Sequence, residues 1–298
     1  MKPAIKQVAG KDLGASVRAR LLNMAKAEQS DFNGVLVRYA LERLLYRLSQ
    51  SAHANSFLLK GAMLFTLWYD MPHRPTRDVD LLGFGPSDQV SITQTFKEIA
   101  SRRVEDGISF DPESVTVEEI RKEAGYAGAR VLITAELAGA RVKTQIDIGF
   151  GDVVTPEPVQ AVYPVLLADF PAPTLQTYPV YTVIAEKLHA IALLGMTNSR
   201  LKDYLDLSVL LERETLDADV LAQAIAATFK RRGMAVPTSL PIGLSDEFAN
   251  DASRQALWRA FLKKNQLVAP PLSNLVLKLA SQLKPMLQRA AKAPLSLN

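Results

Sequence analysis

The segment RPTRDVDLL (residues 74–82) carries most of the information about the fold. It runs from polar residues into apolar ones, which is typical of a loop that enters a buried strand. Because side chains alternate between the faces of a strand, Asp78 and Asp80 are expected on one face, with Val79 and Leu81 packing on the other. Two fixed carboxylates repel each other unless a cation lies between them. Oxygen ligands of this kind suit Mg²⁺.

Most Asp-x-Asp pairs are solvated turn residues, so this pair needs support from its surroundings. The preceding segment, FLLKGAMLFTLWYD (residues 57–70), predicts a strand, a tight turn at Lys60 and Gly61, and a helix. Gly61 would permit a close backbone approach, and the helix N-terminus would offer N–H groups to a phosphate.

A third acid, Asp147, alternates with Gln145 and Gly149 in a second strand-like segment. If its strand neighbours that of Asp80, a three-carboxylate cluster results. Such a cluster can hold two metal ions that activate the attacking oxygen and stabilise the leaving one.

Charged residues also interrupt the apolar segment YTVIAEKLHAIALLGMTNSRLKDYLDL (residues 181–207). Lys187 has two interpretations: its ammonium group snorkels to the surface, or it reaches a nucleotide phosphate. Arg200, Lys202 and Asp203 form either a surface ion pair or part of the same site. We expect His189 to be a packed or capping residue.

The pattern along the chain predicts an α+β fold, with N-terminal helices, a central domain that combines a sheet with helices, and a helical C-terminal domain. Helices are expected over 12–50 with a break at Ser30–Asn33, and over 87–103, 181–195, 201–213, 217–232, 245–265 and 272–292; further strands over 114–120, 129–137 and 141–151. Six prolines in residues 156–179 predict a connector. The expected domains are residues 1–165 and 166–298.

Composition excludes several classes of protein. The 298 residues include no cysteine and three widely spaced histidines, which excludes disulfides, cysteine-ligated zinc and thiol catalysis. No apolar run approaches the roughly 20 residues of a membrane span, and residues 1–12 lack the apolar region of a secretion signal. We expect a cytoplasmic protein with no membrane partner.

The formal net charge of +4 is unevenly distributed. Residues 1–50 hold nine basic and four acidic side chains, residues 51–251 hold 18 and 27, and residues 252–298 hold eight and none. We expect a polyanion such as RNA to bind the basic ends, with an affinity that falls as salt rises.

Taken in order, five motifs resemble the AbiEii/AbiGii nucleotidyltransferase-like toxins of type IV toxin–antitoxin systems: LKGAMLF (59–65), RPTRDVDLLGFG (74–85), QIDIGFGD (145–152), YTVIAEKLHAI (181–191) and RLKDYLDL (200–207). The resemblance extends from about residue 12 to 290. It implies a DNA polymerase β-like nucleotidyltransferase, built on a nucleotidyltransferase-like mixed sheet, that binds Mg²⁺ and an NTP. It further implies nucleotide addition to the tRNA 3′ end that blocks translation, and a separately encoded antitoxin that need not bind this chain.

The resemblance also implies roles for single residues of the first domain. Asp78 and Asp80 would hold Mg²⁺ against the triphosphate, with Asp147 as the third metal-binding acid. The phosphate-binding motif would fall on Lys60, Gly61 and Thr76. Lys60-Gly61 stands where the superfamily more often has Gly-Gly or Gly-Ser, and Thr76 stands where many members have Ser.

In the helical half, Lys187 would neutralise phosphate charge. Asp203 would position or deprotonate the attacking hydroxyl, or orient the basic pair Arg200 and Lys202 beside it, which would also bind the nucleotide. The catalytic set implied by the resemblance is therefore Asp78, Asp80, Lys187 and Asp203.

Two other functions remain open. The acceptor could be a protein side chain, or the chain could be a non-enzymatic module that binds nucleic acid or a partner through its basic ends. A toxin nuclease with an Arg-x₄-His motif is disfavoured because none of the three histidines has Arg at that spacing. The absence of a Walker loop and of a Gly-x-Ser-x-Gly elbow disfavours a P-loop NTPase and an α/β-hydrolase.

Overall fold

The computed structural model describes residues 9–69, 74–121 and 127–293, and the chain folds as two compact units. The sheet unit comprises Met1–Gly151 and Gln160–Thr177; the helical unit comprises Asp152–Val159 and Tyr178–Asn298. The sheet unit extends to Thr177, past the boundary expected after residue 165, because the segment Gln160–Thr177 contributes strands to the sheet. Of residues 1–12, on which the expectation about secretion rests, residues 1–8 lie outside the described residues.

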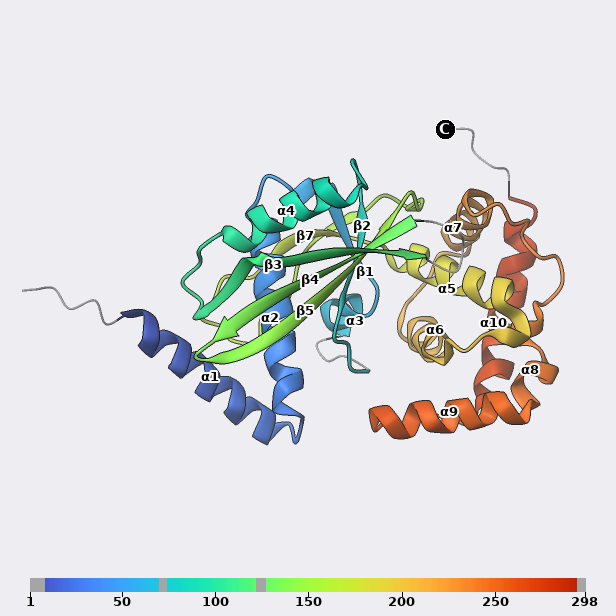
Figure 1. Cartoon of the computed structure of the whole chain (residues 1–298). Helices are drawn as coiled ribbons and strands as arrows, with labels where there is room; N and C mark the ends of the chain where they lie inside the picture. Colours follow the sequence, from blue (N-terminus) through green and yellow to red (C-terminus); the bar gives the residue numbers. More distant parts are fainter. Residues whose placement is uncertain (1–8, 70–73, 122–126, 294–298) are drawn as a thin grey trace, which may run out of the picture. The chain divides into compact units, whose positions relative to one another are not determined.

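A seven-stranded mixed sheet forms the centre of the sheet unit (Figure 1), with strand order β3-β4-β5-β2-β1-β7-β6. β2 pairs in parallel with β5 and antiparallel with β1, and the β3-β4-β5 run is antiparallel. The strands are β1 (Phe57–Lys60), β2 (Val79–Gly83), β3 (Ile108–Arg121), β4 (Ala127–Leu137), β5 (Ala140–Phe150), β6 (Val159–Val162) and β7 (Thr174–Thr177). The strands predicted around residues 57–60, 78–82, 114–120, 129–137 and 141–151 are therefore confirmed.

The helices that accompany the sheet within the described residues are α1 (Ala9–Ala27), α2 (Phe32–Ser49), α3 (Met63–Tyr69) and α4 (Gln89–Ser101). The predicted break between the first two is confirmed, because the Asp31 carboxylate accepts the N–H groups of Asn33 and Gly34 as the N-cap of α2. Apolar residues of α2 such as Leu36, Leu44 and Leu48 are buried in the core.

The proline-rich segment is more than the connector that its composition predicts. Two short strands lie within it, and β7 pairs in parallel with β1 at Leu59 and Thr177. Helix α2 fixes the segment, since Glu42 accepts the Leu166 N–H at 2.6 Å and Arg43 donates to the Pro171 carbonyl at 2.9 Å. These long-range contacts explain why the segment belongs to the sheet unit.

The helical unit contains α5 (Val180–Leu194), α6 (Leu201–Arg213), α7 (Ala218–Arg231), α8 (Asp246–Asn250), α9 (Ala252–Asn265) and α10 (Leu272–Ala290). The single helix predicted over 245–265 is two, because Asp251 ends α8 and caps α9 by accepting the Arg254 N–H. Within the described residues, one window (Val180–Thr197) is long and apolar enough to cross a membrane; half of it is buried, and α5 packs against α6 and α7 as a core helix.

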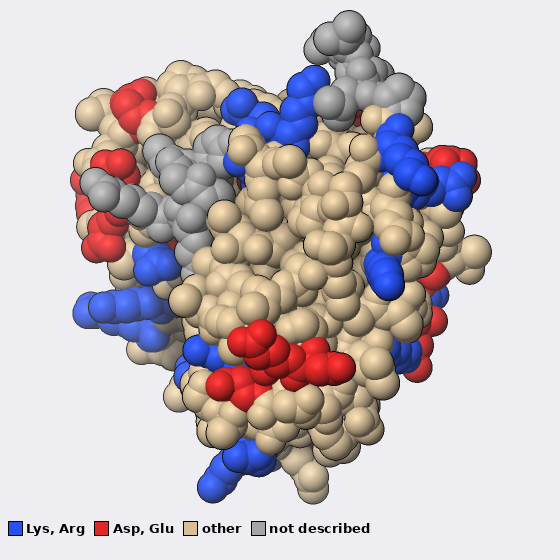
Figure 2. Space-filling model, turned by 90° about the vertical axis from the view of Figure 1, so that its right-hand side faces the viewer, with Lys and Arg blue, Asp and Glu red and all other residues tan. Residues whose placement is uncertain are grey.

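Charged side chains are unevenly distributed over the surface. The centre of the face shown in Figure 2 is largely free of them; a group of acidic side chains lies below the centre, and both basic and acidic side chains lie nearer the edges. Within the helical unit, residues 233–245 contain no charged side chain.

His189 on α5 is a buried packing residue. It is 1% exposed, and its ring packs edge-on against Phe229 at 5.0 Å between centroids. Neither ring nitrogen has a hydrogen-bond partner among the described residues. Burial, with a smaller contribution from the Arg232 charge, lowers the pKa of His189 from 6.5 to about 4.

Replacing His189 with Phe should flatten the pH dependence of stability. The unfolded chain takes up a proton below pH 6.5 and the folded one only near pH 4, so wild type should lose about 3 kcal/mol of unfolding free energy as the pH falls between these values. Urea denaturation at several pH values measures the difference. If the unfolding free energy of both proteins changed equally with pH, His189 would take up its proton in the folded state as readily as in the unfolded one, which would contradict the lowered pKa.

Candidate active site

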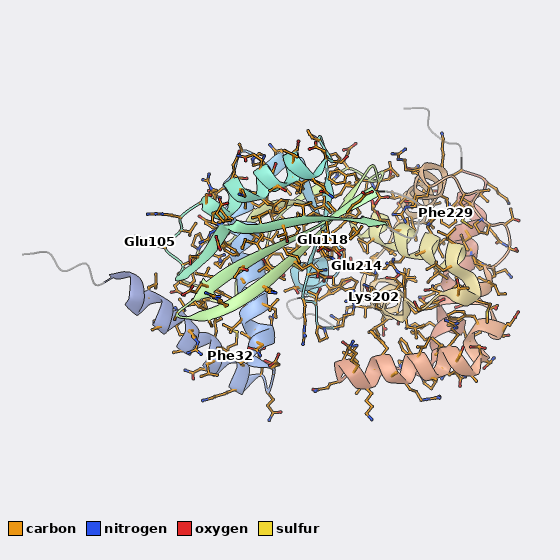
Figure 3. The ribbon with its side chains drawn as sticks, in the orientation of Figure 1. Phe32, Glu105, Glu118, Lys202, Glu214 and Phe229 are labelled. Carbon is orange, nitrogen blue, oxygen red and sulfur yellow. The ribbon has the colours of Figure 1, made fainter. Side chains whose placement is uncertain are left out.

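Four charged residues lie in one row across adjacent strands of the sheet. Lys60 on β1 pairs with Asp80 on β2, Asp80 pairs with Asp147 on β5, and Asp147 pairs with Arg130 on β4. Directly paired residues project from the same face of a sheet. Glu118 on β3, labelled in Figure 3, pairs with Arg130 and extends the row. The sheet therefore presents two adjacent carboxylates with a cation on each side.

Gly61 makes room for one of these carboxylates. Its φ is +74°, and a Cβ at this position would lie 2.1 Å from Oδ2 of Asp80. A glycine is thus required both by the backbone conformation and by the contact with Asp80. The sequence predicted a close approach at Gly61 but did not indicate that the approaching group is Asp80.

Asp78 is held by a local hydrogen bond. The residue precedes β2 by one position, and Oγ1 of Thr76 donates to its Oδ1 at 2.7 Å. Val79, between the two acids, is buried, whereas Asp78 and Asp80 are half-buried. In the sequence the two aspartates therefore flank Val79, whose buried side chain anchors the strand in the core.

Asp147 is engaged by a residue that the sequence did not single out. Nε and Nη2 of Arg130 donate to its two oxygens at 2.9 and 2.8 Å, and the Gln145 amide donates at 3.1 Å. The bond to Asp147 raises the pKa of Arg130 above its ordinary value. A signal was present in the sequence, because a two-residue turn at Ala138 and Gly139 places residue 130 opposite residue 147.

The oxygen donors of Asp78 and Asp80 fit Mg²⁺, which proteins bind through one or two carboxylates together with substrate phosphates. Across residues 9–69, 74–121 and 127–293, no group of three acidic or histidine side chains is close enough to hold one metal ion. Asp147 was expected as the third ligand. In the structure its two oxygens accept from Arg130 instead, so the geometry favours the pair Asp78 and Asp80.

The second group of predicted residues lies in the helical unit and centres on Lys187 of α5. Its Nζ donates to Oδ1 of Asp203 at 2.7 Å and to Oδ2 of Asp206 at 2.6 Å, and Arg200 Nε donates to Oδ2 of Asp203 at 2.7 Å. Both aspartates are fully buried. The interpretation of Lys187 as a simple snorkelling residue is thus incomplete, because its ammonium group is fixed by two carboxylates.

Asp203 stays ionised in this setting. Burial alone would raise its pKa, but the charges of Lys187 and Arg200 outweigh that effect, and the pKa lies below its ordinary value. A carboxylate with a low pKa and both oxygens bonded to cations is better suited to orienting them than to accepting a proton. Asp206, for which the sequence predicted no role, supplies the second bond to Lys187. The sequence signal for it was its three-residue spacing from Asp203, which places both side chains on one face of α6.

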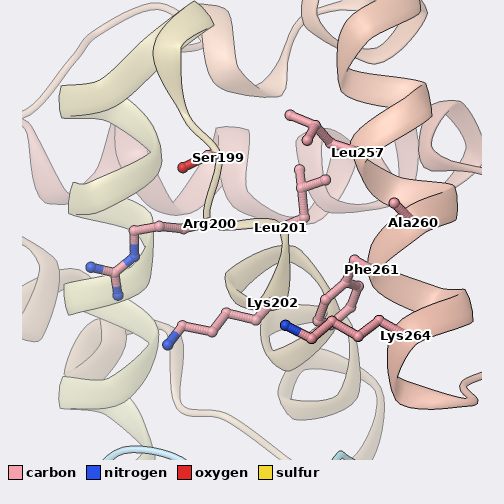
Figure 4. Close-up of a pocket in the computed structure, with 8 residues that line it drawn as sticks. All are labelled: Ser199, Arg200, Leu201, Lys202, Leu257, Ala260, Phe261 and Lys264. Atoms are coloured by element: carbon pink, nitrogen blue, oxygen red, sulfur yellow. The ribbon is translucent and has the colours of Figure 1, made fainter.

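Lys202 is separate from this ion-pair group. Its side chain is exposed and lines a pocket of about 390 Å³ with Lys264 and Phe261 (Figure 4). The predicted residues thus fall into two groups. Lys60, Gly61, Thr76, Asp78, Asp80 and Asp147 belong to the sheet unit, and Lys187, Arg200, Lys202 and Asp203 belong to the helical unit.

Residues 43–285, which include both groups, match the family model described as nucleotidyl transferase AbiEii toxin, type IV toxin–antitoxin system. The chain belongs to this family. It is a nucleotidyltransferase-type toxin with an α+β fold, as the sequence motifs implied.

A solved structure agrees in fold. MenT4, a nucleotidyltransferase toxin from Mycobacterium tuberculosis H37Rv, is similar with a TM-score of 0.52 and 17% identity, over 92% of this chain and 97% of that one. JHP933 from Helicobacter pylori gives a TM-score of 0.47 and 16% identity, over 85% of this chain and 90% of that one. No curated protein matches the chain significantly.

Replacing Gly61 with Ala should impair both folding and activity. Left-handed backbone costs a non-glycine residue about 1–3 kcal/mol, and displacement of Asp80 should reduce nucleotide transfer by about 100-fold. Gly139→Ala is the matched control, because Gly139 has a φ of +79° and a Cβ added there would meet no described atom within 4 Å. Urea denaturation and a transfer assay measure the two effects. Equal activity of both variants would contradict the role of Gly61.

Replacing Lys187 with Met should destabilise the chain by about 3–5 kcal/mol, because it leaves two buried carboxylates short of a cation. Adding Asp206→Asn should recover part of this loss. Lys278→Met is the control, since Lys278 and Glu212 form an exposed pair at 3.3 Å and exposed pairs contribute at most about 1 kcal/mol. Equal losses in urea denaturation for both lysines would refute this account.

Proposed function

We propose that this toxin transfers a nucleoside monophosphate from an NTP to RNA, at the 3′ acceptor end of tRNA, and thereby inhibits translation. The observation that carries the proposal is the register that sets Asp80 between Lys60 and Asp147, against the backbone of Gly61. A phosphoryl-type transfer needs charge stabilisation and alignment more than covalent chemistry from the protein.

In this proposal Asp78 and Asp80 hold Mg²⁺, and the Thr76 hydroxyl keeps Asp78 in place through its 2.7 Å bond. Bound Mg²⁺ supplies positive charge to the triphosphate and fixes its orientation. Asp147 becomes a further ligand only if Arg130 releases one of its oxygens. Lys60 and the N–H groups at Gly61 contribute to phosphate binding from β1 and the turn after it.

The transfer itself joins the acceptor hydroxyl oxygen to the α-phosphorus of the NTP. The bond from that phosphorus to the β-phosphate oxygen breaks, pyrophosphate leaves, and the hydroxyl proton passes to solvent or to a base. Lys187 offsets phosphate charge in this proposal, with Asp203 and Asp206 holding its ammonium group. The low pKa of Asp203 supports an orienting role and argues against its acting as the base.

The proposed partners are an NTP, an RNA acceptor and a separately encoded antitoxin. The RNA would bind basic surface such as residues 252–298, which hold eight basic and no acidic side chains. Such binding should weaken as salt rises, since each phosphate contact releases counterions. The proposed setting is the cytoplasm, where tRNA and nucleotides are available.

Replacing Asp80 with Asn should abolish Mg²⁺-dependent transfer of label from an α-³²P NTP to total RNA while leaving the fold intact, because the substitution removes one metal-binding charge. Glu119→Gln is the matched control, an exposed acid on β3 of the same sheet. We expect wild type and Glu119→Gln to label tRNA and Asp80→Asn to leave it unlabelled. Full activity of Asp80→Asn would refute the proposal, and label on protein instead of RNA would point to a protein acceptor.

A further inference from the structure

The pocket beside Lys202 has an apolar floor and a cationic rim (Figure 4). Leu257, Ala260 and Phe261 of α9 contribute apolar surface, and Arg200, Lys202 and Lys264 contribute cations. Figure 4 shows the charged ends of these three side chains extending to the same side. No carboxylate is among the described residues that line it. The pocket thus combines apolar surface with positive charge.

Phe261 is held in a fixed orientation within this pocket. Its ring stacks on Trp258 with 5.7 Å between centroids and 29° between planes. Trp258 is 2% exposed, and its indole N–H donates to the Pro270 carbonyl at 3.1 Å. Phe261 itself is half-buried. An aromatic ring that is anchored on one side and borders a pocket can stack a planar ligand with little loss of side-chain entropy.

The pocket adjoins the ion-pair group of the helical unit through Arg200. This residue lines the pocket, and its guanidinium donates to Asp203, which also accepts from Lys187. Helix α9 adds the exposed Arg259 and Lys263 to Lys264 and carries no acid. A bound polyanion could therefore extend along α9 away from the candidate active-site residues of this unit.

We propose that this pocket binds an unpaired base of the RNA acceptor, stacked on Phe261, with the neighbouring phosphates on Lys202 and Lys264. The inference rests on the proposed function and assigns its acceptor a binding surface. Aromatic rings combined with cations are how proteins hold single-stranded nucleic acid without reading its sequence. The lack of carboxylates among the described lining residues argues against the NTP as occupant, because its Mg²⁺ needs oxygen ligands.

Fluorescence anisotropy with a labelled single-stranded RNA oligonucleotide tests the inference on the full chain, without NTP or Mg²⁺. Phe261→Ala should weaken RNA binding about tenfold, and Phe261→Tyr should retain it. Lys202→Ala and Lys264→Ala, both at exposed positions, should each lower the salt dependence of binding. Leu277→Ala and Lys230→Ala are the controls, because both residues are exposed and neither lines the pocket.

RNA affinity unchanged in Phe261→Ala, Lys202→Ala and Lys264→Ala would overturn the inference. So would a loss of affinity for a fluorescent NTP, rather than for RNA, in Phe261→Ala. The two lysine variants keep the test decisive if the Phe261 variant fails to fold. RNA binding that depends on Phe261 in a protein without transfer activity would support the pocket and refute the proposed function. Transfer activity in wild type, combined with an RNA affinity that Phe261→Ala leaves unchanged, would support the proposed function and refute the pocket.

Discussion

The pairing of Lys60, Asp80 and Asp147 across β1, β2 and β5 is the constraint on which the candidate site depends. A slip of one residue in β2 would turn Asp80 to the opposite face and bring apolar side chains in its place. Burial of Val79 and Leu81 opposes such a slip, because it would move both side chains out of their buried positions and onto the face of Asp80. The apolar core of the sheet therefore fixes the position of the charges, and Gly61 leaves the space that Asp80 occupies.

Electrostatics organises the helical unit in a different way. Asp203 and Asp206 are fully buried, and burying two carboxylates is tolerated because Lys187 bonds to both and Arg200 bonds to one. A buried network of this kind adds little net stability, because desolvation offsets the attraction between the charges, but it holds the lysine ammonium group in one place. In the proposed reaction this fixed position suits a group that offsets phosphate charge, since a rigid cation needs little reorganisation during the transfer.

The residues predicted from the sequence are those whose signal is local. Alternation around Val79 indicated Asp78 and Asp80, and a glycine between a strand and a helix indicated Gly61. The engagement of Asp147 by Arg130 depends on the pairing of β4 with β5, and the recruitment of β6 and β7 depends on contacts with α2 and β1. Proline content concealed those two strands. The two-residue turn at Ala138 and Gly139 is a local signal for the first pairing, whereas the contacts of β6 and β7 are non-local and leave little trace in a single sequence. The expected roles of Lys187 and Asp203 came from the family resemblance and not from alternation.

The central claim is that Asp78 and Asp80 form the metal-binding part of the site. Anomalous diffraction from crystals soaked with Mn²⁺ and a non-hydrolysable nucleoside triphosphate tests it most directly, because manganese replaces magnesium at oxygen sites and is located by its own signal. The account predicts an anomalous peak within bonding distance of the Asp78 and Asp80 carboxylates and next to the triphosphate. A peak elsewhere, with the nucleotide bound away from these two residues, would contradict it.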